Sequence, residues 1–156
     1  MAETPSIEDF YREHSPAVYA LLVSLCRDPV SAEDLMQDTF AKATRFLGGY
    51  RGGDPRSWLF TIARSVFVDD VRPPPPTGEQ LEQSAADPDV TEIEVISGIL
   101  AMLPERQRTA LLLADQAGLS MAEIAATLGI SVGAAKVLVH RGRLRFRRFY
   151  QEEAGE

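Results

Sequence analysis

The chain has 156 residues, 45% of them hydrophobic, which suffices for one ordinary domain or two very small ones. Its one cysteine, Cys26, excludes an internal disulfide and a multi-cysteine zinc site, and its apolar setting favours a packed helix residue. No apolar run approaches the about 20 residues that span a bilayer, and the first residues lack the basic and apolar parts of a signal peptide. We expect a cytoplasmic protein without membrane insertion, cofactor or metal.

The formal net charge of −7 conceals an uneven distribution. Residues 73–97 carry six acidic side chains and no basic one, whereas residues 131–150 carry six basic side chains and no acidic one. The local balance of charge decides what a segment attracts. We therefore expect a nucleic-acid contact at the basic segment and protein contacts elsewhere.

Hydrophobic periodicity predicts two helices at the start of the chain. The first covers about 7–28, and Pro16 either kinks or restarts it. The second covers 32–47, with Ser31 and Asp34 in a capping-box pattern at its start. Its predicted core face contains Leu35, Thr39, Ala43, Phe46 and Leu47.

A third helix is predicted at 55–72, with Asp54 as its N-cap and Pro55 in its first turn. The four prolines at 73–76 cannot continue a helix and favour an extended backbone. The acidic stretch that follows them has the composition of a linker. These features divide the chain into an N-terminal domain, a linker, a C-terminal domain and an acidic tail, at residues 1–72, 73–90, 91–150 and 151–156.

The C-terminal domain is predicted to contain four helices, at residues 91–102, 104–118, 121–128 and 132–150. Ser120 and Glu123 form a capping box for the third of them. Gly129 marks the turn that follows, and Ser131 caps the last helix. A short helix, a four-residue turn with glycine and a longer basic helix are typical of a helix-turn-helix. The chain is therefore predicted to be all-α.

The last helix divides into two faces. Its apolar face should pack inward and contains Ala135, Leu138, Val139, Gly142, Phe146 and Phe149. Its basic face contains Lys136, His140, Arg143 and Arg147, with further arginines on its flank. Such a helix meets base edges in the major groove through its first turns and phosphates through its cations. The alternative is a solvated basic face, or one paired with the acidic linker.

Several motifs resemble extracytoplasmic-function sigma factors of the sigma-70 family, in the family's order. LPERQR (103–108), GLSMAEIA (118–125) and GISVG (129–133) are similar to the C-terminal promoter-binding domain. AEDLMQDTF (32–40) resembles the helix that docks on the polymerase clamp, and RSWLFTIAR (56–64) resembles the −10-element helix. The resemblance implies two helical domains, a region 2 bundle and a region 4 helix-turn-helix. It also implies an alternative sigma factor that is not an enzyme.

The implied partners are the RNA polymerase core, through its β′ clamp and β flap, promoter DNA and an anti-sigma factor. The implied polymerase-binding residues are Asp34, Leu35, Gln37, Asp38, Phe40 and Arg45. The implied −10 contacts are Tyr50, Arg51, Arg56, Trp58, Thr61, Arg64, Ser65 and Arg72. An aromatic side chain there can stack on an unpaired base, although a core tryptophan remains the alternative for Trp58. The implied −35 contacts are Ser131, Gly133, Ala134, Lys136, Val137, His140, Arg141 and Arg143.

The sequence departs from the family at two places. Val137-Leu138 stand where a Ser-Arg pair is common, and Ser65 stands where asparagine is frequent. Three other functions remain as alternatives. One is a helix-turn-helix regulator that acts without core polymerase, and another is an adaptor that has lost DNA binding. The third is an enzyme whose acid–base or metal cluster would comprise His14, Glu33, Asp34 and Asp38.

Overall fold

The computed structural model describes residues 6–70 and 92–154. Within these ranges every regular element is helical, as the sequence predicted. The predicted linker 73–90, the −10 candidate Arg72 and the last two residues of the predicted tail lie outside the described residues.

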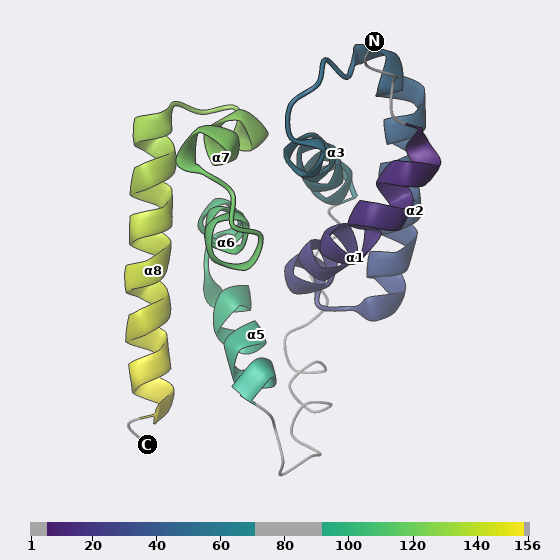
Figure 1. Ribbon diagram of the computed structural model, residues 1–156. Helices are drawn as coiled ribbons and strands as arrows, with labels where there is room; N and C mark the ends of the chain where they lie inside the picture. The colour runs from purple at the N-terminus through teal and green to yellow at the C-terminus, as the bar shows by residue number, and fades with distance from the viewer. Residues whose placement is uncertain (1–5, 71–91, 155–156) are drawn as a thin grey trace.

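The N-terminal half is a bundle of three helices (Figure 1): α1 (Ile7–Cys26), α2 (Pro29–Phe46) and α3 (Pro55–Asp69). A 3₁₀ turn, η1 (Leu47–Gly49), follows α2. The three helices pack because each carries an apolar stripe at helical spacing. Val18, Leu22, Leu59 and Ala63 are fully buried where these stripes meet.

The corner between α1 and α2 differs from the prediction. Pro16 does not restart the helix, because α1 continues through it. Asp28, not Ser31, caps α2: its carboxylate accepts a hydrogen bond from the backbone N–H of Val30 at 3.2 Å, and the Ser31 hydroxyl donates to it at 2.7 Å. The cap lies earlier than predicted because Pro29 is suited to the first turn of a helix.

The inward face predicted for α2 is correct except at its end. Leu35, Thr39 and Ala43 are buried, whereas Phe46 is 57% exposed. The last turn of α2 therefore extends past the bundle core and presents an aromatic ring to solvent.

The C-terminal half contains α5 (Glu92–Met102), α6 (Glu105–Leu111), α7 (Met121–Leu128) and α8 (Val132–Ala154). The helix predicted at 104–118 is interrupted, because α6 passes into a π-helical turn, η2 (Leu112–Gln116). In that turn the N–H of Ala117 donates to the carbonyl of Leu112 at 3.0 Å. The last helix is longer than predicted and takes in part of the acidic tail.

Two glycines set the geometry of the helix-turn-helix. Gly129 ends α7 with a φ of 68°, a left-handed conformation that favours glycine, and α7 and α8 are bent by 99° at this turn. Gly142 lies where α8 crosses α6, and a Cβ there would approach the carbonyl oxygen of Gln107 to 3.2 Å. The absence of a side chain thus lets the two helices pack closely.

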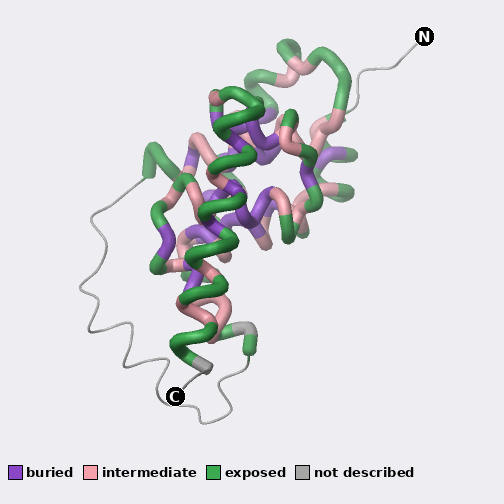
Figure 2. The backbone as a smooth tube through the Cα atoms, turned by 90° about the vertical axis from the view of Figure 1, so that its left-hand side faces the viewer, coloured by how far each residue is buried: buried purple, intermediate pink, exposed green. Residues whose placement is uncertain are grey.

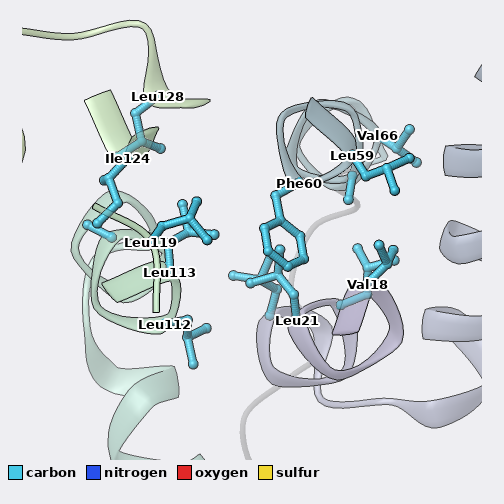
Figure 3. Close-up of a cluster of buried hydrophobic side chains, with 14 of the residues drawn as sticks. Val18, Leu21, Leu59, Phe60, Val66, Leu112, Leu113, Leu119, Ile124 and Leu128 are labelled. Atoms are coloured by element: carbon cyan, nitrogen blue, oxygen red, sulfur yellow. The ribbon is translucent and has the colours of Figure 1, made fainter. Parts of the chain in front are cut away.

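The two halves lie against each other (Figure 1). Helix α3 contacts α7, and α1 contacts α6 and η2. Figure 3 shows Phe60 and Leu21 of the N-terminal bundle near Leu113 of the C-terminal half. A single cluster of buried hydrophobic residues draws on both halves. The structure is therefore a closed arrangement of the two domains.

Figure 2 shows the buried residues inside the structure and the exposed residues on its outer surface. Helix α8 is exposed along much of its outer side. Among the described residues, no single helix is long and apolar enough to cross a membrane; α7 and α8 pass that test only as a bent pair.

Candidate nucleic-acid and protein interfaces

Helix α2 presents the polar face that the sequence assigned to the polymerase core. Asp34, Gln37, Asp38 and Arg45 are all exposed. Two other candidates from the same motif point inward, since Leu35 is 4% exposed and Phe40 is 7% exposed. Both belong to the buried core beneath this face, and Phe40 also lines an adjoining groove.

An open groove adjoins this face, between α1 and α2, with a volume of about 740 Å³. Ile7, Tyr11, Phe40 and Thr44 are among the residues that line it. The rings of Tyr11 and Phe40 meet edge to face with centroids 5.0 Å apart, and Tyr11 is 47% exposed. Sequence reasoning missed the groove, because the exposure of Tyr11 becomes visible only in the structure.

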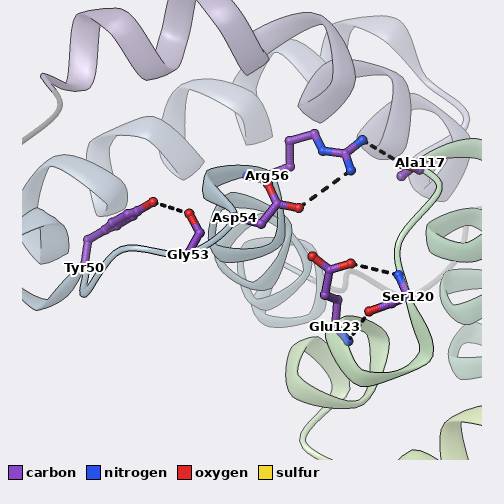
Figure 4. A network of polar contacts seen from close by, with 7 residues as sticks. All are labelled: Tyr50, Gly53, Asp54, Arg56, Ala117, Ser120 and Glu123. Atoms are coloured by element: carbon purple, nitrogen blue, oxygen red, sulfur yellow. Dashed lines mark hydrogen bonds and ion pairs between the residues drawn. The ribbon is translucent and has the colours of Figure 1, made fainter.

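An aromatic cluster lies at the start of α3. The ring centroid of Trp58 is 5.2 Å from that of Tyr50 and 6.0 Å from that of Phe10. The Tyr50 hydroxyl donates a hydrogen bond of 2.6 Å to the carbonyl of Gly53, which fixes the preceding loop (Figure 4). Trp58 is half-buried. One part of its surface therefore packs in the cluster and another remains accessible, so the −10 contact of Trp58 stays a prediction.

The start of α3 is capped as predicted. The Asp54 carboxylate accepts from the N–H of Arg56 at 3.0 Å and lies 3.6 Å from the Arg56 guanidinium. The same guanidinium donates to the carbonyl of Ala117, 2.7 Å away in the other half of the chain (Figure 4). Arg56 is thus held from both sides.

Further along α3, Arg64 forms a bidentate pair with Glu105 of α6. The guanidinium nitrogens lie 2.9 Å and 3.3 Å from the two carboxylate oxygens, and the Thr109 hydroxyl donates to the same carboxylate at 2.5 Å. Burial acts to raise the pKa of Glu105, but the hydrogen bonds from Arg64 and Thr109 and the charges of Arg64 and Arg108 outweigh it. The pKa of Glu105 is therefore below its ordinary value.

Of the remaining −10 candidates, Thr61 and Ser65 form hydrogen bonds within the chain and Arg51 is exposed. The Thr61 hydroxyl donates to the carbonyl of Ser57 at 2.9 Å and lies 3.2 Å from the hydroxyl of Thr127 in α7. The Ser65 hydroxyl donates to the carbonyl of Ile62 at 2.8 Å. Arg51 is exposed in the loop before α3.

The helix-turn-helix is built as the sequence predicted. The Ser120 hydroxyl accepts from the N–H of Glu123 at 3.2 Å, and the Glu123 carboxylate accepts from the N–H of Ser120 at 2.8 Å (Figure 4). Ser131 caps α8 by accepting from the N–H of Ala134 at 3.1 Å. In each helix of the motif a serine side chain thus accepts one of the first-turn N–H groups.

The outer face of α8 carries the −35 candidates on one exposed surface. The exposed members are Ser131, Gly133, Ala134, Lys136, Val137, His140, Arg141 and Arg143. Ala135 and Val139 are buried on the opposite face, as predicted, and Leu138 is half-buried. Arg143 pairs with Asp115 through contacts of 2.5 Å and 3.1 Å, and the hydrogen bonds to Asp115 raise the pKa of Arg143.

The proposed acid–base cluster has an ordinary structural setting. The His14 ring packs edge to face against Phe10 and lies 3.7 Å from its neighbour Glu13. In the parts of the chain that the structure describes, no three histidine, cysteine or acidic side chains are grouped as metal ligands. Cys26 is half-buried at the end of α1, and burial raises the pKa of its thiol.

Comparisons with known proteins agree with this architecture. The family models for sigma-70 region 2 and sigma-70 region 4 match residues 10–73 and 93–146. The chain is 33% identical to the ECF RNA polymerase sigma factor SigE of Mycolicibacterium smegmatis, over 99% of this chain and 65% of that protein. It is 30% identical to the ECF RNA polymerase sigma factor SigM of Bacillus subtilis, over 93% of this chain and 95% of that protein.

Two solved structures share the fold over nearly the whole chain. One is the sigma factor RpoE of Bartonella quintana in complex with the anti-sigma factor NepR, with a TM-score of 0.75, 30% identity, and coverage of 92% of this chain and 98% of that one. The other is CnrH in complex with the cytosolic domain of CnrY, with a TM-score of 0.70, 25% identity, and coverage of 94% and 88%. The chain therefore belongs to the sigma-70 family, as an extracytoplasmic-function sigma factor, the class of protein that directs transcription initiation.

Proposed function

We propose that this sigma factor binds the RNA polymerase core through the exposed face of α2 and recognises a promoter through α3 and α8. The observation that carries the proposal is the outer face of α8, the second helix of a capped helix-turn-helix. Lys136, His140 and Arg141 are exposed on this face. A helix presented in this way fits the major groove of duplex DNA. This surface would bind the −35 element.

The −10 element requires different chemistry, because its bases must leave the stack before they can be read. Trp58 and Tyr50 would offer aromatic surface to an unpaired base. Arg56 and Arg64 would hold phosphates of the separated strand. Trapping unstacked bases offsets part of the cost of opening, which is a few kcal/mol for each flipped base. The opening would therefore need no catalytic group of the chain's own.

The −10 contact and the −35 contact are each small, and joining them in one chain raises the overall affinity for the promoter. A tether converts the second binding event into an intramolecular one, which raises avidity without any new contact. The net charge of −7 repels bulk DNA. We therefore expect promoter binding to be weak for the free protein and strong once the core polymerase fixes both domains. RpoE, a structural relative, is in complex with an anti-sigma factor, and such a partner would oppose promoter binding here by holding both domains.

The test is transcription from promoter DNA by sigma-free core polymerase. Lys136→Ala combined with Arg141→Ala should abolish the specific transcript, because it removes two cations from the −35 surface. The control is Arg12→Ala combined with Arg106→Ala, which removes the same charge from exposed positions on α1 and α6 and should leave the transcript intact. An adaptor would not respond to the α8 variant, and a plain regulator would bind the duplex tightly without core.

A further inference from the structure

Arg143 differs from the other cations on the −35 surface of α8. Among the described residues, it alone of the basic −35 candidates pairs with a carboxylate, that of Asp115 in η2. Lys136 and Arg141 are exposed on the same surface without such a partner. A carboxylate beside a DNA-binding surface repels phosphates. Asp115 would therefore weaken DNA binding if its charge were its only effect.

The packing of α6 against α8 brings the two side chains together. A Cβ on Gly142 would lie 3.2 Å from the carbonyl oxygen of Gln107 and 3.7 Å from the Cβ of Leu111, so this row of α6 faces α8. Asp115 continues the row into η2, because positions four apart lie on one helical face. The close crossing at Gly142 thus places its neighbour Arg143 within reach of Asp115.

The pairing engages one edge of the Arg143 guanidinium. Its Nε and Nη2 nitrogens donate to the two oxygens of Asp115 at 3.1 Å and 2.5 Å. A guanidinium carries five N–H donors in a planar fork. The two hydrogens of Nη1 and the second hydrogen of Nη2 therefore remain for another oxygen ligand. The Arg143 side chain is 46% exposed, which leaves it accessible to such a ligand.

The position of Arg143 along α8 suits a phosphate better than a base edge. It lies about three turns beyond Val132, the first residue of α8, which is about 16 Å at a rise of about 1.5 Å per residue. The major groove is only about 12 Å wide. A helix that reads base edges through its first turns therefore carries Arg143 toward the phosphates at the rim of the groove.

We propose that Asp115 is a positioning residue for the −35 contact, which holds one edge of the Arg143 guanidinium so that the other edge faces a DNA phosphate. The inference rests on the proposed function, since it concerns the same surface of α8. A long arginine side chain loses rotamer freedom when it binds, and Asp115 imposes part of that order before DNA arrives. The benefit of this order exceeds the repulsion between Asp115 and DNA. The proposal also gives a role to η2, since π-helical turns are frequent at functional sites.

The first test measures binding of the holoenzyme, core polymerase with the full chain, to a fluorescent promoter fragment over a series of salt concentrations. Asp115→Asn should weaken binding about two- to tenfold, the equivalent of ordering one long side chain. The dependence of affinity on salt should stay as in the wild type, because Arg143 still neutralises its phosphate. Arg143→Ala should instead lower the salt slope by about one. Binding by Asp115→Asn that equals or exceeds that of the wild type would overturn the proposal.

Arg143→Lys provides an independent variant. Lysine keeps the charge but has no planar fork that could bind a carboxylate on one edge and a phosphate on the other. This variant should therefore resemble Asp115→Asn, with weaker binding and an unchanged salt slope. Affinity equal to that of the wild type would contradict the two-edged contact.

A double-mutant cycle separates positioning from a general effect on the fold. In a chain that already carries Arg143→Ala, Asp115→Asn should cause no further loss, because the side chain that it positions is absent. An equal loss in both backgrounds would show that Asp115 acts through the fold and would refute the proposal. Glu94→Gln removes one carboxylate charge at an exposed position of α5 and should bind as the wild type does. If the wild-type holoenzyme itself binds no promoter, the proposed function fails instead.

Discussion

The turn of the helix-turn-helix offers a prediction whose sign can be derived from backbone geometry alone. Gly129 has a φ of 68° and nothing within 4 Å of the position a Cβ would take. Gly129→Ala therefore adds no clash and costs only the left-handed conformation, roughly 1–2 kcal/mol. Restricting the unfolded chain returns about 0.4–1 kcal/mol. We expect a net loss of about 1 kcal/mol.

The same substitution at Gly98 is the matched control. Gly98 lies inside α5 with no positive φ, and its Cβ position is also free of neighbours within 4 Å. Alanine there should stabilise the protein by up to about 1 kcal/mol, because glycine is the weaker helix former. Urea unfolding followed by circular dichroism should move the two midpoints in opposite directions. A Gly129→Ala protein as stable as the wild type, or two shifts of equal sign, would refute the reasoning.

Three further predictions concern other parts of the molecule. Tyr50→Phe removes the 2.6 Å hydrogen bond to Gly53 and should lower stability by about 1 kcal/mol, measured by thermal denaturation; an unchanged melting temperature would contradict it. Val137→Ser replaces an apolar side chain that is 46% exposed on α8. It should weaken any preference for a thymine methyl in the −35 element about fivefold, measured by transcription from a randomised −35 library; an identical base preference would argue against a base contact. Because the pKa of Glu105 is lowered, its contribution to stability is complete above its ordinary pKa and is lost as the pH falls through the lowered value. The stability difference between wild type and Glu105→Gln should therefore shrink in acid, and a difference independent of pH in urea unfolding would contradict this.

Local signals account for most of what the sequence predicted correctly. The Ser120–Glu123 capping box and the Asp54-Pro55 start are patterns in which neighbouring residues satisfy each other's backbone groups. The buried positions Leu35, Thr39 and Ala43 of α2, and Ala135 and Val139 of α8, followed from helical periodicity. The start of α2 was misplaced because two capping patterns overlap there, and Asp28, followed by Pro29, caps the helix in place of Ser31.

The contacts between the halves had no such signal. Nothing near Arg64 in sequence indicates Glu105, and nothing near Thr61 indicates Thr127, because pairs so far apart leave no periodic pattern in one chain. The π-helical turn after α6 was also unforeseen, since the residues of η2 are ordinary helix formers. The sequence therefore predicted the helices within each domain. It did not predict that the C-terminal half packs against the N-terminal half.

The most direct measurement of the central claim is transcription of genomic DNA by sigma-free core polymerase, with and without this protein, with the 5′ ends of the RNA mapped. The account predicts new start sites that share two sequence motifs, near −10 and −35, at a constant spacing. Addition of the protein without new start sites, or start sites with no shared upstream motif, would contradict the claim that α3 and α8 direct promoter recognition.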